Sequence, residues 1–208
     1  NPPLHAWAAW QVYVLDGARD HGFLVRVFGK LLLNFGWWVN RKDLDGSSVF
    51  EGGFLGMDNV GLFDRSAPLP AGYRLEQSDA TSWMAFYCLQ MLKISVALAI
   101  EVKAWDECAT KFLEHFLSIA QAMRRFGSND VVLWDEEDGF YYDLLRLPDG
   151  SATRLKVRSL VGLLPLCATT VIEKEQRERV PNAMRYVQER LRRIPELSAT
   201  MHPTGPGH

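Results

Sequence analysis

Residues 79–102 read DATSWMAFYCLQMLKISVALAIEV, and apolar side chains occupy nearly every face of the helix that this stretch would form. A helix that is apolar all round needs protein neighbours on all sides, so we predict a buried inner helix with Asp79 as its N-cap. Residues 104–126 instead carry a stripe of apolar side chains at three- to four-residue spacing, which predicts an outer helix with Asp106 facing water. The stripe comprises Trp105, Cys108, Phe112, Phe116, Ile119 and Met123.

The same alternation occurs on both sides of this pair. Residues 3–15 are apolar nearly all round, whereas residues 20–40 carry an apolar stripe. Residues 157–172 are again apolar and residues 174–194 are again striped, with Pro181 marking either the real start of the last helix or a kink. Buried and amphipathic helices therefore alternate, which predicts an all-α fold built from pairs of inner and outer helices.

Three such pairs would form an arc and not a closed ring. We therefore expect about half of an (α/α)6 toroid over residues 1–195, followed by a flexible tail over residues 196–208 that is rich in helix-breaking Gly and Pro. An incomplete toroid leaves part of its inner surface uncovered. The apolar inner face, with Trp83, Phe86 and Val161, predicts self-association or contact with the missing half.

The two long connections, residues 41–78 and 127–156, each follow an outer helix and precede an inner one. Because the helices run alternately up and down, both connections are expected at one end of the assembly. Long loops in a compact domain are usually functional, so we expect the site at that end. The pairs Asp138-Gly139 and Asp149-Gly150 are hairpin signals and predict a small β-ribbon in the second connection.

Composition excludes several classes of function. The 23 Lys and Arg against 25 Asp and Glu give a formal net charge of −2, which argues against nucleic-acid or anionic-membrane partners. The sequence has no glycine-rich phosphate loop, nucleophile elbow or Cys/His metal spacing, so no metal or cofactor is expected. Cys88, Cys108 and Cys167 lie in apolar runs and are expected to be buried, reduced thiols. Without a signal peptide or a long apolar run, we expect a cytoplasmic protein.

Carboxylates and aromatic side chains remain as candidates for chemistry. In the first connection, Glu51 and Asp58 lie among aromatic and glycine residues, which fits either a solvated loop or a site that the backbone approaches closely. In the second connection, Trp134 precedes four consecutive acidic residues that are expected to face water. Trp134, Phe140 and Tyr141 either stack on a sugar or pack under the β-ribbon, and the sequence leaves both open.

Several ordered motifs resemble glycoside hydrolase family 63, most closely its bacterial glucosidase-like branch. The resemblance extends over roughly residues 1–195. It is carried by WVNRKD (38–43), FEGGFLGMDN (50–59), LEQSD (75–79), LWDEEDGFYYD (133–143) and KVRSLVG (156–162). It implies an (α/α)6 toroid that hydrolyses α-linked glucosyl or related bonds of oligosaccharides with inversion.

The resemblance also implies roles for single residues. Gly56-Met57-Asp58 matches the segment that holds the family's general acid, so Asp58 would be the acid, and the general base would be a Glu outside this chain. Leu55 before this segment and Val60-Gly61-Leu62 after it depart from the family's pattern, which affects the substrate subsite. The substrate-binding candidates within the motifs are Glu51, Phe54, Asn59, Glu76, Gln77, Asp79 and Trp134.

Two other functions stay open at this stage. One is a helical-repeat interaction module without catalysis, in which a protein partner fills the concave surface. The other is a sugar-binding remnant that keeps aromatic platforms and has lost hydrolysis. The length of the parent open reading frame separates them from the enzyme, because a parent of several hundred residues favours a complete catalytic toroid.

Overall fold

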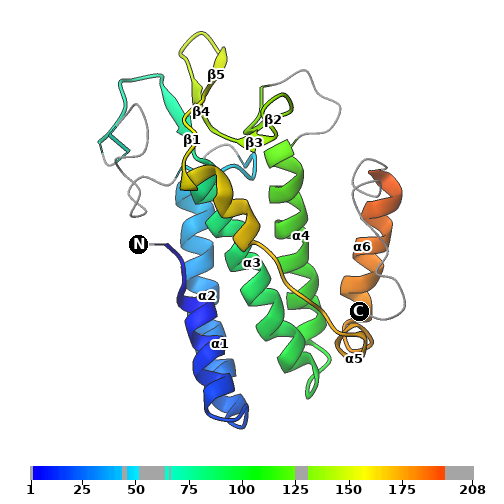
Figure 1. The fold of residues 1–208 in the computed structure, drawn as a ribbon. Coiled ribbons are helices and arrows are strands. Elements are labelled where there is room, and N and C mark those ends of the chain that lie inside the picture. The colour runs from blue at the N-terminus through cyan, green and yellow to red at the C-terminus, as the bar shows by residue number, and fades with distance from the viewer. Residues whose placement is uncertain (1, 44–45, 52–63, 66, 125–130, 195–208) are drawn as a thin grey trace.

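The computed structural model describes residues 2–43, 46–51, 64–65, 67–124 and 131–194, and these are mostly helical, with small antiparallel sheets (Figure 1). The expected tail, residues 196–208, lies outside the described residues. The elements in chain order are α1 (His5–Leu15), α2 (His21–Lys42), β1 (Arg74–Glu76), α3 (Ser78–Ala99), α4 (Trp105–Arg124), β2 (Trp134–Asp135), β3 (Phe140–Tyr141), β4 (Asp143–Arg146), β5 (Ala152–Leu155), the 3-10 helix η1 (Leu160–Cys167), α5 (Lys174–Arg177) and α6 (Pro181–Arg193).

Helix α3 forms the centre of the core, as predicted for an inner helix. All of its residues are buried except Trp83, Phe86 and Lys93, which are half-buried. Helices α1, α2 and α4 and the 3-10 helix η1 all pack against it. Burying a helix of this length on every side removes a large apolar area from water, and this is the main favourable term for the fold.

The start of α3 differs from the prediction. The helix begins at Ser78 with Gln77 in the N-cap position, so the prediction that Asp79 is the N-cap is wrong. Asp79 lies in the first turn, fully buried, and its carboxylate binds the guanidinium of Arg65. Asp79 therefore binds Arg65, a partner that is distant in the chain, and does not cap the helix as the local pattern predicted.

Helices α2 and α4 present the predicted apolar stripes to the core. Phe28 and Phe35 of α2 each meet Phe112 of α4 edge to face, with ring centroids 6.0 and 5.1 Å apart. Edge-to-face pairs of this kind stabilise packing beyond the area they bury. The prediction that both helices turn an apolar stripe toward the core is therefore confirmed.

Asp106 at the start of α4 does not face water, and that prediction is wrong. It is 4% exposed and accepts hydrogen bonds from the backbone N–H groups of Asn182, at 3.0 Å, and Ala183, at 3.2 Å. These groups belong to the first turn of α6, whose N–H groups have no partner within the helix. Helix α6 begins at Pro181, which confirms that this proline marks the real start of the last helix.

The predicted inner helix over residues 157–172 does not form. In its place is η1, an eight-residue 3-10 helix with Pro165 inside it, followed by residues without regular secondary structure up to α5. Proline lacks the N–H group that an α-helix needs in its interior and clashes with the preceding turn. The stretch is apolar, as the prediction assumed, but it is not buried on all sides, because Leu160, Leu163 and Leu166 of η1 are exposed.

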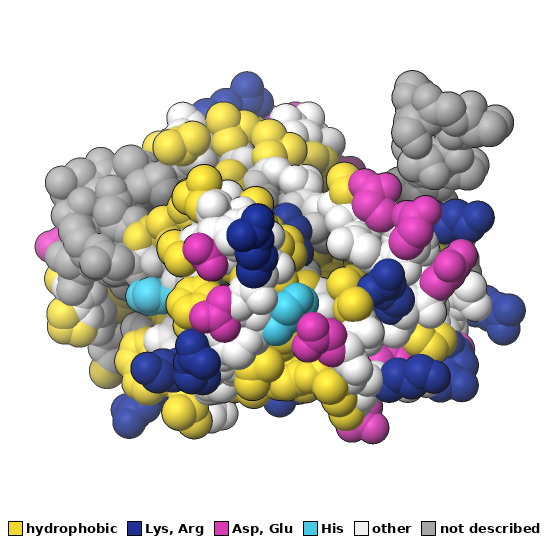
Figure 2. Space-filling view, turned by 90° about the horizontal axis from the view of Figure 1, so that it is seen from below, with side chains coloured by type: hydrophobic (Ala, Val, Ile, Leu, Met, Phe, Trp, Pro, Cys, Tyr) yellow, Lys and Arg dark blue, Asp and Glu magenta, His cyan; other side chains and the backbone are white. Residues whose placement is uncertain are grey.

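Helix α1 is also less buried than predicted. It contacts α2 and α3, yet Trp7, Val12, Val14 and Leu15 are exposed, the last at 86%. Of the three helices predicted to be apolar all round, α3 alone is nearly fully buried among the described residues. At the end opposite the sheets, hydrophobic side chains lie among charged groups of both signs (Figure 2).

The sheets gather at one end of the helices (Figure 1). Strands β1, β4 and β5 form an antiparallel sheet in that order, with Glu76 opposite Leu144 and Asp143 opposite Leu155. Strands β2 and β3 form a separate two-stranded ribbon. Strand β1 comes from the first long connection and β4 from the second, so the prediction that both connections meet at one end is confirmed. The predicted ribbon is confirmed too, whereas closure into a toroid stays a prediction.

The three cysteines differ in exposure. Cys88 is buried and burial raises the pKa of its thiol, whereas Cys108 is half-buried and Cys167, at the end of η1, is exposed. The expectation of three buried thiols is therefore wrong for Cys167. The reason is the same as for the exposed leucines of η1: only one face of this short 3-10 helix packs against the core.

Candidate functional site

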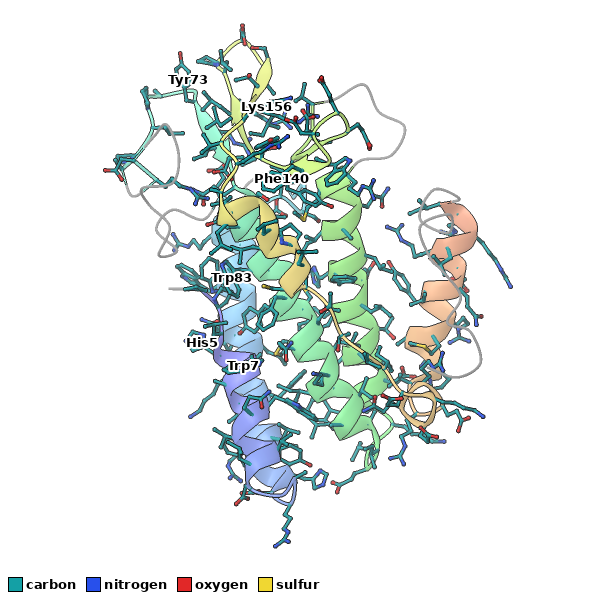
Figure 3. All side chains as sticks on the ribbon, in the orientation of Figure 1. His5, Trp7, Tyr73, Trp83, Phe140 and Lys156 are labelled. Atoms are coloured by element: carbon teal, nitrogen blue, oxygen red, sulfur yellow. The ribbon has the colours of Figure 1, made fainter. Side chains whose placement is uncertain are left out.

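A cavity of about 230 Å³ opens at the sheet end, between the first connection and β1. Figure 3 marks this end with Tyr73, which lines the cavity, with Phe140 of β3 and with Lys156, which follows β5. The residues that line the cavity are Glu51, Asp64, Arg65, Ala67, Pro68, Leu69, Tyr73, Arg74, Leu75 and Gln77. Carboxylates, guanidinium groups and an aromatic side chain therefore line the same cavity, a mixture that suits a ligand with many hydroxyl groups.

One of the residues that line this cavity, Arg65, is almost fully buried. The side chain of Arg65 is 2% exposed, and both of its terminal nitrogens donate to the carboxylate of Asp79. Its Nη2 also lies 3.3 Å from Oδ2 of Asp143, the first residue of β4. We call Arg65, Asp79 and Asp143 the helix-start cluster. A guanidinium that meets a carboxylate through two nitrogens is fixed in orientation as well as in position.

Asp143 links this cluster to the backbone of α3. Its Oδ1 accepts a hydrogen bond of 2.8 Å from the backbone N–H of Ser78, which satisfies one of the open donors at the start of the helix. Burial raises the pKa of Asp143 to about 6, and the positive charge of Arg65 and the Ser78 bond lower it only in part. Asp79 nearby raises it further, because two carboxylates share one cation.

Two other arginine–carboxylate pairs flank the cavity. Nε of Arg74 donates to Oε1 of Glu51 at 2.8 Å, and both side chains line the cavity. In the neighbouring strand, Arg146 of β4 binds Glu76 of β1, whose side chain is 7% exposed. The two pairs therefore join β1 to Glu51 and to β4.

Trp134 lies apart from the cavity, in the β2–β3 ribbon. Its ring centroid is 4.8 Å from that of Tyr141, and the guanidinium carbon of Arg124 lies 4.9 Å from it. The indole is half-buried between these neighbours, and its Nε1 has no hydrogen-bond partner among the described residues. The structure thus supports packing within the ribbon as the role of Trp134.

The acidic run after Trp134 is only partly solvated, so the expectation that all four acids face water is wrong. Asp135 is 4% exposed, and Lys156 binds both it and Asp138, at 3.0 and 3.1 Å. Arg158 adds a second cation 2.9 Å from Asp138. We call Asp135, Asp138, Lys156 and Arg158 the ribbon cluster. The middle two acids, Glu136 and Glu137, are exposed as predicted.

Comparison with known proteins identifies the family. The family model described as mannosylglycerate hydrolase MGH1-like glycoside hydrolase domain matches residues 1–195. The chain belongs to this glycoside hydrolase family. The match confirms the resemblance seen in the sequence motifs, since the family is related to GH63-like enzymes.

Two curated proteins are similar to this MGH1-like domain. An uncharacterized protein of the yeast Saccharomyces cerevisiae is 49% identical over 188 residues, which are 83% of this chain and 17% of the yeast protein. An uncharacterized protein of Borreliella burgdorferi is 21% identical over 164 residues, which are 79% of this chain and 29% of that protein. The MGH1-like domain described here thus spans less than a third of either relative. Among its described helices, none has the length and apolar character needed to cross a bilayer.

The predicted site residues of the MGH1-like domain fall into three groups. Asp58, Phe54 and Asn59 lie outside the described residues. Glu51 and Gln77 line the cavity. Glu76, Asp79 and Trp134 contact other protein groups beside it or in the ribbon.

Sequence reasoning missed Arg65, Arg74, Tyr73 and Asp143 of the MGH1-like domain. Asp143 closes one of the motifs that carried the family resemblance, and Arg65 follows Asp58 within the same connection. Both could have been suspected from these positions. Their pairing could not, because residues 65 and 143 belong to different connections.

Proposed function

We propose that this domain is part of an inverting glycosidase that acts on α-linked oligosaccharides, glucosidic or related, with Asp58 as the general acid. The observation that carries the proposal is the position of Glu51 and Asp64, which both line the cavity and are the described residues on either side of the segment 52–63. The described residues that precede and follow the segment of Asp58 therefore both lie at this cavity. Membership of a glycoside hydrolase family supplies the reaction class.

The cavity supports a sugar as the ligand. Its volume of about 230 Å³ gives room for a single sugar ring. Glu51 and Gln77 offer acceptors and Arg74 offers donors along the same wall. A sugar hydroxyl both donates and accepts, so a wall with both kinds of group can hold it in one orientation. We expect Glu51, Phe54, Asn59, Glu76 and Gln77 to bind or shape this subsite.

Inversion requires two carboxyl groups on opposite faces of the sugar. The acid protonates the leaving oxygen while the base activates a water, and the two carboxyls lie about 6.5–9.5 Å apart to leave room for that water. Asp58 would supply the proton. The base would come from a part of the protein outside this chain, and that part would also cover the exposed apolar faces of α1 and η1. The oligosaccharide, the inverting course and this contact are all parts of the proposal.

The test uses the full-length gene product. Asp58→Asn is expected to reduce turnover of α-glucosides with poor leaving groups by about 10²–10⁴-fold, because general-acid assistance contributes that much when the leaving oxygen is basic. Substrates with activated leaving groups should be affected much less. The matched control is Asp149→Asn, the same change in the exposed β4–β5 turn, where Asp149 contacts only its neighbour Ser151 among the described residues.

Three results would each contradict a part of the proposal. Equal losses on both kinds of leaving group would remove Asp58 from the acid role. Retention of the anomeric configuration, read by NMR from the first product formed, would exclude an inverting mechanism. Measurable hydrolysis by the 208-residue chain alone would place the base within it.

A further inference from the structure

Phe50 and Arg65, which lie on either side of the segment 52–63, are both attached to the start of α3. At the near end, the backbone N–H of Phe50 donates to Oγ1 of Thr81 at 3.0 Å, and the Phe50 carbonyl accepts from the N–H of Gln77 at 3.1 Å. At the far end, Arg65 binds Asp79 through both terminal nitrogens. Attachment at both ends limits the conformations open to the residues between them.

The attachment point is itself held firmly. Thr81 donates its hydroxyl to the carbonyl of Gln77 at 2.7 Å, so the acceptor that holds Phe50 is fixed to the helix start. Asp143 binds the N–H of Ser78 and also meets Arg65, which joins the helix start to strand β4. Arg65 thus contacts carboxylates from two different elements while it is almost fully buried.

We propose that Arg65 is a positioning residue that orients the segment carrying the acid, with Asp79 and Asp143 as its two counter-ions. The role of Arg65 in turnover rests on the proposed function of Asp58. The attachment of the chain on either side of the segment is independent of that function, because it follows from the contacts of Phe50 and Arg65. Arginine suits this role because its planar group binds a carboxylate in a fixed orientation, which a lysine ammonium does not.

Hydrogen exchange tests the attachment without any substrate. In the full chain, Arg65→Lys is expected to speed exchange of the amides in residues 52–63 by about ten- to a hundredfold, the range expected for losing one hydrogen bond to a charged group. Amides in the middle of α3 should keep their wild-type rates. The matched control is Arg190→Lys, because Arg190 also bridges two elements, α6 and α4, through a bond to Gln121, and lies far from this segment in the chain.

Equal exchange of residues 52–63 in Arg65→Lys and Arg190→Lys would overturn the proposal. If Arg65→Lys also speeds exchange throughout α3, the variant has lost global stability and Asp143→Asn replaces it. Asparagine can still accept the bond from Ser78 but carries no charge for Arg65, so faster exchange confined to residues 52–63 supports the proposal and unchanged exchange overturns it.

Kinetics of the full-length protein then test the positioning role. Arg65→Lys should lower kcat about ten- to a hundredfold and leave KM within about twofold, because a displaced catalytic group slows the chemical step more than binding. Unchanged kcat together with faster exchange would overturn the positioning role. If instead Asp58→Asn keeps full turnover, the proposed acid fails, and the exchange result still decides whether Arg65 attaches the segment.

Discussion

The helix-start cluster and the ribbon cluster are built alike and behave differently. In each, one cation lies between two carboxylates: Arg65 between Asp79 and Asp143, and Lys156 between Asp135 and Asp138. The ribbon holds two further cations, because Arg154 also binds Asp135 and Arg158 also binds Asp138. The side chain of Arg65 is 2% exposed and that of Lys156 is 46% exposed. Two carboxylates therefore share one buried cation at the helix start, whereas three more exposed cations surround the two carboxylates of the ribbon.

The carboxyl pKa values differ in direction between the clusters. In the ribbon, the pKa of Asp138 is lowered, first by its hydrogen bond with Lys156 and then by that with Tyr142. The pKa of Asp135 is lowered chiefly by the backbone N–H of Asp138. At the helix start, burial raises the pKa of Asp143 despite its cation. The comparison shows that the partners of a buried carboxylate decide the direction of its pKa shift: Asp135, only 4% exposed, is bound by a backbone N–H and two cations, whereas Asp143 shares one cation with Asp79.

The largest effect should follow removal of the buried cation. Arg65→Met leaves Asp79 and Asp143 buried without their counter-ion, and breaking a buried pair in this way costs about 3–5 kcal/mol of unfolding free energy. Urea denaturation at neutral pH measures the loss. A variant as stable as the wild type would mean that water reaches the cluster, and the contrast with the ribbon would disappear.

A pH series compares the two clusters directly. The folded pKa of Asp143 is about 6, above its ordinary value of 3.8, so its contribution to stability is fully present below the ordinary value and is lost as the pH rises through about 6. Relative to Asp143→Asn, the wild type should therefore lose on the order of 3 kcal/mol between about pH 4 and pH 6 to 7.

The ribbon should show the opposite sign. Because the folded pKa of Asp138 is lowered, its contribution is present above the ordinary value and is lost as the pH falls through the folded one. The sign of each contribution is measured from the urea midpoints of Asp143→Asn, Asp138→Asn and the wild type at a series of pH values. Equal slopes for the two variants would contradict the comparison.

Packing should matter more than charge for the position of the ribbon. A Cβ on Gly162 of η1 would overlap the ring of Phe140 and the carbonyl of Tyr141 in β3. Gly162→Ala should therefore cost about 1–3 kcal/mol, the usual range for overpacking. Urea denaturation measures the cost, and Gly36→Ala is the control, because a Cβ there meets nothing within 4 Å. Equal stability of the two variants would show that η1 and the ribbon do not pack closely.

The smallest effect is expected for the half-exposed cation. Lys156→Met should change the urea midpoint only slightly, because exposed ion pairs contribute little and salt screens them. The same measurement at about 0.5 M salt should reduce even this difference. A loss as large as that of Arg65→Met would mean that the ribbon cluster is as poorly hydrated as the helix-start cluster.

The pattern of apolar side chains was enough to predict five of the helices and the position of the long connections. The apolar stripes of α2 and α4 and the all-round apolar α3 follow directly from side-chain spacing, because a helix places every third or fourth residue on one face. The turn signals Asp138-Gly139 and Asp149-Gly150 likewise predicted the ribbon, since glycine adopts the positive φ found at both positions. The family, too, was recognisable from its motifs.

Tertiary structure decided what depends on distant partners. Apolar composition over residues 157–172 suggested a helix, but Pro165 and the ribbon packed on Gly162 left a short 3-10 helix. Asp106 caps a helix that begins 75 residues later, and Asp143 meets an arginine 78 residues before it. Sequence spacing determines which side chains share a face of one element. Which charges meet in a buried site depends on how the elements pack, because only packing removes the water that would otherwise separate them.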